Sequence, residues 1–263
     1  MDKTTKAWTN GLIGVLIFAG SLPATRAAVM DFDPFFLTGA RASIAGLLGL
    51  ILLRALGQRR PSRQNLASLV LTAIGVVLGF PLLTALALQH ISSAHSLVYI
   101  GLLPVSTAIF GVLRGGEQPR PAFWLFSLLG SAFVVGYAAM GDIQASLQGD
   151  LYMLAAIVVC GLGYAEGASL SRTLGGWQVI SWALVLSLPV MIPFTLWVMP
   201  TSFSQVSISA WTGLVYVSLF SMLIGFIFGY RGLSQGGLQP LASCSCCSPF
   251  SVWAWQPCSC MKR

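Results

Sequence analysis

Charged side chains are scarce in this sequence of 263 residues. Only 8% of the residues are Asp, Glu, Lys or Arg, against about 25% in a typical soluble domain. Hydrophobic residues make up 56% of the chain, and the mean hydropathy is +0.82. Several apolar runs reach the roughly 20 residues that a helix needs to cross a bilayer. They are continuous rather than alternating, which argues against a membrane β-barrel. The composition therefore predicts a polytopic all-α membrane protein rather than a soluble protein with a large core.

Motifs for catalysis and for nucleotide hydrolysis are also missing. The glycine-rich stretches lack the Gly-Lys-Ser/Thr ending of a phosphate-binding loop, so ATP-driven transport has no support. No HExxH motif and no paired-carboxylate site emerges from the sequence. We therefore expect neither an enzyme nor a bound cofactor. The net charge of +7 does not indicate nucleic acid, because the basic residues lie in short loops between apolar spans.

Eight membrane spans follow from the apolar runs, and the first is interpreted as a retained helix because no small-residue cleavage site follows it. They run about Trp8–Met30, Phe35–Leu56, Leu66–Leu88, Ser93–Leu113, Pro121–Met140, Leu151–Leu170, Val179–Met199 and Trp211–Leu233. Basic residues precede the first span and recur in every second loop. The positive-inside rule therefore predicts a cytoplasmic N-terminus in the inner (plasma) membrane.

An internal repeat is indicated at an offset of about 145 residues. This offset superposes LVLTAIGVVLGFPLLTALALQH on LVYVSLFSMLIGFIFGYRGLSQ and brings Arg26 close to Arg172. The spacing implies five spans per copy, and an odd number inserts the second copy upside down, as in many secondary transporters. We expect a first repeat at residues 8–140, an incomplete second repeat at 149–240 and an aberrant Cys-rich tail at 241–263.

Several short pieces resemble, in order and spacing, the EamA-like branch of the drug/metabolite transporter superfamily. They are Pro23-Ala24-Thr25-Arg26, Arg41, the hairpin ALALQHISSAHSLVYIGLLP, Glu117, Gly149-Asp150-Leu151 and FGYRGLSQGG. The resemblance implies ten helices in two inverted five-helix repeats around a cavity used for alternating access. Members mostly move amino acids, metabolites or drugs, often outward. We therefore expect a secondary exporter of a small-molecule substrate, with about eight of ten helices intact, and with proton coupling and a homodimer as further options.

The tail LASCSCCSPFSVWAWQPCSCMKR departs from the family pattern, which has two more helices. It holds five of the six cysteines, but it has no His, and its CSCC spacing matches no tetrahedral zinc set. A disulfide cluster is disfavoured because this end is predicted to be cytoplasmic and reducing.

A frameshift explains the tail better. If Ser and Cys are AGC and TGC codons, sliding the frame back by one nucleotide gives Gln and Leu and restores an apolar ninth span. Its proline and glutamate then fall where the offset carries Pro104 and Glu117. We expect a frameshift near Leu238–Leu241. The alternative is an inactive truncated membrane protein without transport activity.

Ionisable residues within spans are functional candidates, because an unpaired charge there costs several kcal/mol. Glu166 is the first candidate: it is expected to face a cavity and to bind a cationic group or relay a proton. The repeat offset carries it to Ser21, on the opposite side of a shared site. A structural pairing of Glu166 with Arg172 is the alternative.

Further candidates are Arg41, which either binds a substrate carboxylate or extends toward the outer face as an anchor, and three aromatic residues. Tyr99, Tyr164 and Trp182 either wall a ligand pocket or anchor helices at the interface. His90 and His95 are expected to have loop or cap roles, with proton coupling as the alternative. Prolines 23, 81, 104, 189 and 193 are expected to interrupt helices, which membrane proteins tolerate beside a cavity.

Overall fold

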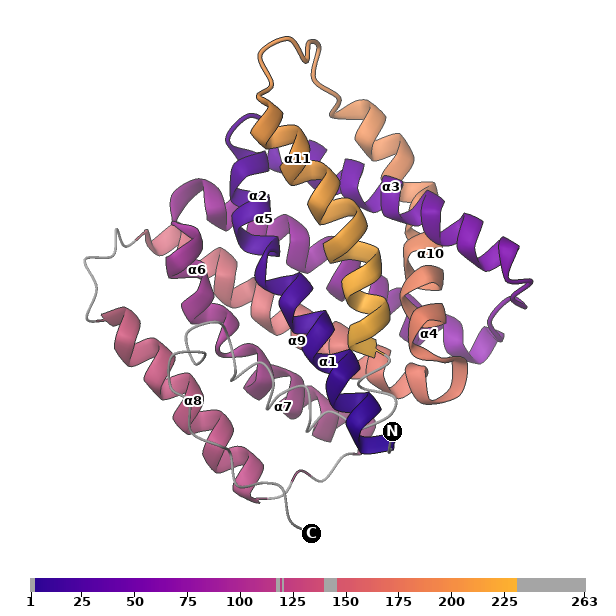
Figure 1. The fold of residues 1–263 in the computed structure, drawn as a ribbon, viewed down its shortest axis with the longest axis vertical. Helices are drawn as coiled ribbons and strands as arrows, with labels where there is room; N and C mark the ends of the chain where they lie inside the picture. Colours follow the sequence, from indigo (N-terminus) through magenta and orange to yellow (C-terminus); the bar gives the residue numbers. More distant parts are fainter. Residues whose placement is uncertain (1–2, 117–118, 120, 140–145, 231–263) are drawn as a thin grey trace.

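The computed structural model describes residues 3–116, 119, 121–139 and 146–230. Every regular element in these ranges is a helix, which confirms the predicted all-α bundle (Figure 1). The elements are α1 (Lys3–Ala19), α2 (Ser21–Val29), α3 (Pro34–Ala55), α4 (Arg63–Thr72), η1 (Ala73–Gly79), α5 (Phe80–His90), α6 (Ser93–Ile100), α7 (Leu103–Gly115), α8 (Pro121–Ala139), α9 (Leu147–Leu174), α10 (Gly176–Trp197), α11 (Ile208–Tyr216) and η2 (Val217–Gly225). Residues 226–230 continue the helix after η2.

Seven helical stretches in this part of the chain are long and apolar enough to cross a membrane. They are Thr9–Val29, Pro34–Ala55, Arg63–His90, Ser93–Arg114, Leu147–Leu174, Gly176–Trp197 and Ile208–Tyr230. The predicted fifth span corresponds to α8, a helix of 19 residues without a charged side chain. Glu117, the last residues of the predicted eighth span and the whole predicted tail lie outside the described residues.

Local sequence signals explain where the helices begin. At α3, the Asp33 carboxylate accepts hydrogen bonds from the backbone N–H groups of Phe35 (2.8 Å) and Phe36 (3.2 Å), and Pro34 fits the first turn because it has no N–H to satisfy. The side chains of Ser92, Ser146 and Ser207 accept hydrogen bonds from the first turns of α6, α9 and α11 in the same way.

Two spans contain π-helical segments instead of a continuous α-helix. In the third span the π-segment is η1, which ends at Gly79, two residues before Pro81, and the N–H of Phe80 donates to the carbonyl of Gly75. Pro81 has no N–H, so the ordinary helical ladder is interrupted there. In the last described span the π-segment is η2. A shift of 145 residues places Ala73 on Ser218 and Gly79 on Ile224, so the two segments coincide within the proposed repeat.

The contacts between helices also agree with the proposed repeat. The helices α1 and α2 pack on α11 and η2, whereas α9 packs on α4, η1 and α5, and α3 packs along α10 (Figure 1). If each helix is replaced by its counterpart in the other proposed repeat, the contact of α1 and α2 with α11 and η2 becomes the contact of α9 with α4, η1 and α5. The contact of α3 with α10 stays the same. Both observations support inverted repeats, while the repeat boundaries stay a prediction. The helix α8 lies at the edge of the bundle against α6 and α7.

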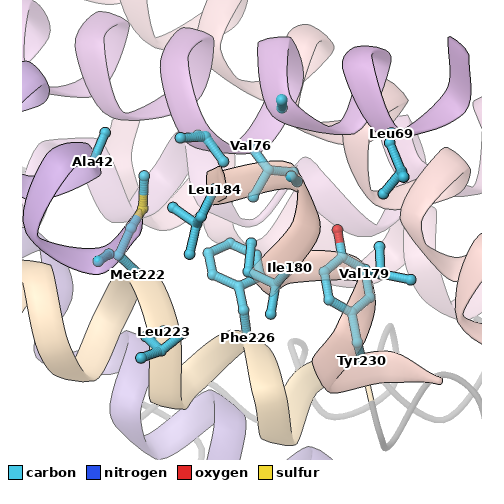
Figure 2. Packing of buried hydrophobic residues seen from close by; sticks show 14 of the residues in the cluster. Ala42, Leu69, Val76, Val179, Ile180, Leu184, Met222, Leu223, Phe226 and Tyr230 are labelled. Atoms are coloured by element: carbon cyan, nitrogen blue, oxygen red, sulfur yellow. The ribbon is translucent and has the colours of Figure 1, made fainter. Parts of the chain in front are cut away.

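The largest buried apolar cluster joins α3, α4, η1, α9, α10 and η2. Figure 2 shows Val76, Leu184 and Ile180 near the centre of this cluster, with Ala42 and Met222 on one side and Leu69 on the other. A second cluster lies between α2, α3, α5 and α11, around Phe32, Leu37 and Leu88. The first cluster therefore fixes η1 and η2 against α3 and α10.

Most charged residues sort to two ends of the bundle. One end, called the acidic end below, carries Asp31, Asp33 and Asp150. Asp31 accepts hydrogen bonds from the hydroxyl and the backbone N–H of Ser207. These hydrogen bonds lower the pKa of the Asp31 carboxyl because they favour its charged form. The other end, called the basic end, carries Arg54, Arg59, Arg60, Arg63, Arg114 and Arg172.

Glycine allows the close approach of η1 to α9. A methyl group on Gly75 would lie 2.7 Å from the Cα of Gly163 and 2.8 Å from the carbonyl oxygen of Val159. Since backbone atoms cannot yield as side chains do, Gly75→Ala should destabilise the bundle by about 1–3 kcal/mol. The melting temperature of the purified protein in detergent measures this.

The matched control is Gly136→Ala in α8, where an added methyl group meets no atom within 4 Å. This change should leave the melting temperature equal or slightly higher, because Ala favours helix. Equal melting temperatures for the two variants would contradict the close packing of η1 on α9.

Candidate functional site

A cavity of about 170 Å³ lies among the helices that carry the breaks and the π-segments. Its lining comes from α1, α2, α3, η1, α5, α6, α7, α8, α9 and η2, and most of it is apolar. The residues in the lining that carry polar side chains are Ser21, Thr25, Arg41, Thr84, Thr107, Tyr164 and Ser221. None of the described lining residues is acidic, so the only formal charge there is that of Arg41.

Arg41 is buried in the lining, with 4% of its surface exposed. Its Nη2 group donates to the hydroxyl of Ser221 at a long 3.4 Å and approaches the sulfur of Met222 at 3.7 Å. Its Nε–H has no hydrogen-bond partner among the described residues. A buried cation normally has a carboxylate partner, and no described carboxylate forms an ion pair with this one. The expectation that Arg41 extends toward the outer surface is therefore wrong.

The break between α1 and α2 and the π-segment η2 bring three polar groups together. Ser21 begins α2 directly after the break at Gly20, and its hydroxyl lies 2.8 Å from the hydroxyl of Ser221 in η2. Ser221 in turn accepts from Arg41. A hydrogen-bonded chain therefore runs along the cavity from Arg41 on α3 through Ser221 on η2 to Ser21 on α2.

Aromatic side chains form an apolar wall of the same cavity. The rings of Phe18 and Phe226 meet edge to face with centroids 4.8 Å apart, and Tyr164 lies 5.7 Å from Phe226. Phe80 and Phe123 add to the lining. This combination of apolar walls with a few polar groups is typical of sites for small organic molecules.

Three of the six predicted site residues line the cavity: Ser21, Arg41 and Tyr164. Glu166, Tyr99 and Trp182 are not in the lining. Trp182 is half-buried and packs against the largest apolar cluster, because its position on α10 turns it toward that cluster rather than toward the cavity. Sequence reasoning missed Ser221 and Thr84. Both residues lie in the two segments that the repeat offset superposes. A small polar residue within an otherwise apolar segment was the signal that could have indicated them.

Glu166 lies near the basic end rather than in the cavity. Its Oε1 accepts a hydrogen bond from Nε of Arg114 at 2.6 Å, and the Glu166 side chain is 7% exposed while that of Arg114 is 52% exposed. This ion pair joins α7 to α9. Pairing with Arg172, six residues further along the same helix, was the sequence-based alternative; the structure instead supplies a partner from another helix.

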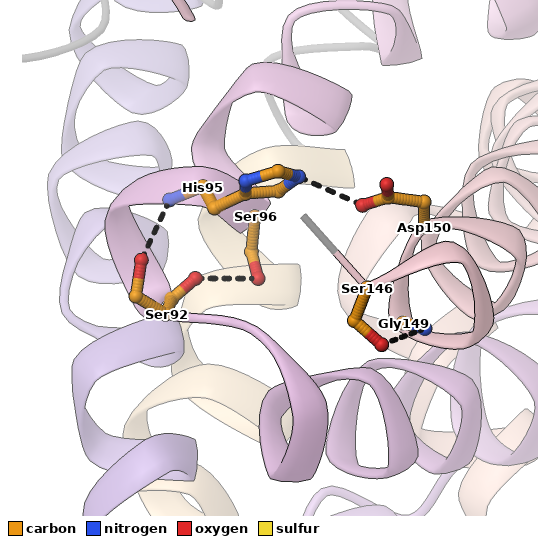
Figure 3. Close-up of polar contacts among 6 residues, drawn as sticks. All are labelled: Ser92, His95, Ser96, Ser146, Gly149 and Asp150. Carbon is orange, nitrogen blue, oxygen red and sulfur yellow. Dashed lines mark hydrogen bonds and ion pairs between the residues drawn. The ribbon is translucent and has the colours of Figure 1, made fainter. Parts of the chain in front are cut away.

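A second ion pair joins the same two spans near the acidic end. The Nε2 atom of His95 on α6 lies 2.7 Å from Oδ1 of Asp150 on α9, and Figure 3 shows the two side chains directed toward each other. The backbone N–H of His95 also donates to the hydroxyl of Ser92, which caps α6. Tyr99 lies against the His95 ring, with centroids 5.7 Å apart. His95 therefore joins two spans in addition to lying in a capped first turn.

The fold and the cavity are those of a polytopic membrane transporter, and similarity to known proteins identifies the family. Residues 6–138, half of the chain, match the EamA-like transporter family. The uncharacterized transporter YdeK of Bacillus subtilis (strain 168) is 62% identical over 250 residues, which cover 95% of this chain and 87% of that protein. The chain therefore belongs to the EamA-like transporter family.

More distant relatives have the same general description. A probable terminal-alkyne amino-acid exporter of Streptantibioticus cattleyicolor is 24% identical over 233 residues, covering 87% of this chain and 77% of that protein. One solved crystal structure matches with a TM-score of 0.68 at 19% identity, covering 96% of this chain and 90% of that one. At that identity the likeness shows the fold alone.

The ion pair between Arg114 and Glu166 gives a stability prediction. Arg114→Gln leaves the buried carboxylate of Glu166 without its countercharge, which should cost about 1–3 kcal/mol and lower the melting temperature in detergent. The double variant with Glu166→Gln should recover part of the loss, because two amides can hydrogen bond. Arg59→Gln, in an exposed loop at the same end, is the control. A double variant no more stable than Arg114→Gln would refute the pairing.

Proposed function

We propose that the protein is a secondary transporter that exports small organic molecules by alternating access through the central cavity. The observation that carries the proposal is the cavity itself, whose lining joins helices of both proposed repeats around one buried cation. The description of a 24% identical relative as a probable exporter supports the outward direction. Transporters of inverted-repeat design place their substrate sites at such interfaces.

The fourth span supplies a hinge for this mechanism. It is broken between α6 and α7 at Gly101 and Leu102, and Pro104 has no N–H to continue the ladder. The freed carbonyl of Gly101 accepts a hydrogen bond from the hydroxyl of Ser131 on α8 at 2.8 Å. The outer half α6 can therefore rotate relative to α7 without leaving this carbonyl unsatisfied.

The two ion pairs hold both halves of the fourth span against α9. His95 and Asp150 hold α6 on α9 near the acidic end, and Arg114 and Glu166 hold α7 on α9 near the basic end. Opening the cavity at one end requires separation of the pair at that end. Proton coupling would act at His95 and Asp150, where a proton changes the attraction between the two side chains.

The basic end is proposed to face the cytoplasm of the inner membrane, with the N-terminus on the same side. The support is the positive-inside rule applied to the arginines at that end. The acidic end then faces outward.

Cysteine labelling tests this orientation. In a background with all six cysteines replaced, Gln205→Cys in the exposed loop of the acidic end should react with a membrane-impermeant maleimide in intact cells. Arg59→Cys should react only after permeabilisation. The reverse pattern would overturn the proposed orientation, and labelling of both in intact cells would reveal mixed insertion.

A variant that fills the cavity tests transport. Thr107 lines the cavity from α7, so Thr107→Trp should reduce efflux of preloaded labelled amino acids, including one terminal-alkyne amino acid, to the rate of cells without the protein. Leu113→Trp, on the same helix with 71% of its surface exposed, is the matched control and should keep the full rate. Equal rates for both variants, at equal amounts in the membrane, would reject the cavity as the pathway.

A further inference from the structure

The feature left unexplained by helix packing is the buried positive charge of Arg41. A guanidinium stays protonated in proteins, and a charge inside a span is costly unless it is paired or faces water. The two described ion pairs use Asp150 and Glu166 elsewhere. Nothing acidic in the described lining compensates Arg41, so an anion entering the cavity would find an uncompensated cation there.

The free hydrogen-bonding capacity of Arg41 has a definite geometry. Nε and Nη2 lie on one edge of the planar guanidinium, which is the edge that binds a carboxylate through two parallel hydrogen bonds. Of these two groups, Nε has no described partner and Nη2 has only the long contacts with Ser221 and Met222. Both groups can therefore turn to a ligand with little loss of existing hydrogen bonding.

Neighbouring hydroxyl groups extend the site. Thr84 also lines the cavity and is 3% exposed, yet its hydroxyl oxygen has no described hydrogen-bond partner. Among the described residues, the side chain of Ser221 hydrogen bonds to Ser21 and Arg41, and that of Ser21 to Ser221; both hydroxyl groups can donate to an oxygen placed beside the guanidinium. Buried polar groups without partners cost about 1–3 kcal/mol each, and a bound anion would satisfy several at once.

We propose that Arg41, together with Ser21 and Ser221, forms a subsite for the carboxylate of the transported molecule, so that substrates are small organic acids or amino acids with an apolar body. The inference rests on the proposed function, since the cavity must be the transport pathway. The carboxylate binds at the guanidinium edge, while the apolar body lies against Phe226, Phe80 and Tyr164. Purely cationic compounds are excluded by repulsion from the uncompensated charge.

Direct binding tests the subsite without relying on transport. The full-length protein in lipid nanodiscs is titrated with norleucine, hexanoate and the uncharged hexanamide, while tryptophan fluorescence and the melting temperature are followed. Norleucine and hexanoate should bind and stabilise the protein, whereas hexanamide should bind about 10- to 100-fold more weakly, as expected for the loss of charge-assisted hydrogen bonds. Equal binding of hexanoate and hexanamide to the wild-type protein would overturn the proposal.

Variants assign the effect to Arg41. Arg41→Gln should remove the preference for hexanoate over hexanamide, and Arg41→Lys should keep part of it. The control is Arg26→Gln: Arg26 donates to the carbonyl of Leu88 and does not line the cavity, so the preference should remain. Without ligand, Arg41→Gln should be as stable as the wild type or more stable, because removing an uncompensated buried charge costs no ion pair. A large loss of stability would indicate a structural role and contradict the proposal.

Chloride distinguishes an organic substrate site from a site for inorganic anions. Chloride should compete weakly with hexanoate; saturation by chloride with no competition from hexanoate would overturn the proposal. The efflux assay separates this inference from the proposed function. If Thr107→Trp stops efflux but acids and amides leave at equal rates, the transporter stands and the subsite falls. If nothing is exported but hexanoate binding still requires Arg41, the subsite stands and the transport function falls.

Discussion

Inside a bilayer the backbone has no water to hydrogen bond with, so each span must satisfy its own N–H and C=O groups or find substitutes. Of the seven long described spans, α3, α9 and α10 do so as uninterrupted helices. The exceptions lie together: the break at Gly20, the segments η1 and η2, and the break before Pro104 all contribute residues to, or lie next to, the central cavity. Irregular backbone is tolerated there because hydroxyl groups such as that of Ser131 replace the lost partners. The need to satisfy the backbone thus determines where the bundle is open.

The absence of water inside the bilayer also determines where charged side chains are placed, because an unpaired charge there is costly. Two described carboxylates have basic partners on other helices: Glu166 pairs with Arg114, and Asp150 pairs with His95. Both pairs join the fourth span to α9, one near each end. Arg41 alone enters the cavity without a described countercharge, and this difference from the paired charges is the basis of the proposed carboxylate subsite.

Much of the fold was predictable because hydropathy and span length depend on composition over about 20 residues. The α-helical class and seven of the spans follow from the mean hydropathy of such stretches. The site was less predictable because it depends on which face of a helix a residue occupies. Trp182 and Glu166 look functional along the chain, yet α10 turns the first toward the apolar cluster and α7 supplies a partner to the second. Ser221 was missed because a π-segment changes the helical register that sequence periodicity assumes.

The proposed repeat relates the backbones of the two halves but not their chemistry. An offset of 145 residues carries Arg41 to Leu186, Ser221 to Val76 and Ser21 to Glu166. Leu186 packs against the largest apolar cluster, and Glu166 is already paired with Arg114. The cavity therefore has one polar pole, beside Arg41, and mostly apolar walls elsewhere. A symmetric backbone can exchange its two ends, as alternating access requires, while a single cationic pole holds an asymmetric substrate in one orientation. In the proposed mechanism, selectivity therefore depends on Arg41 rather than on the helices that move around it.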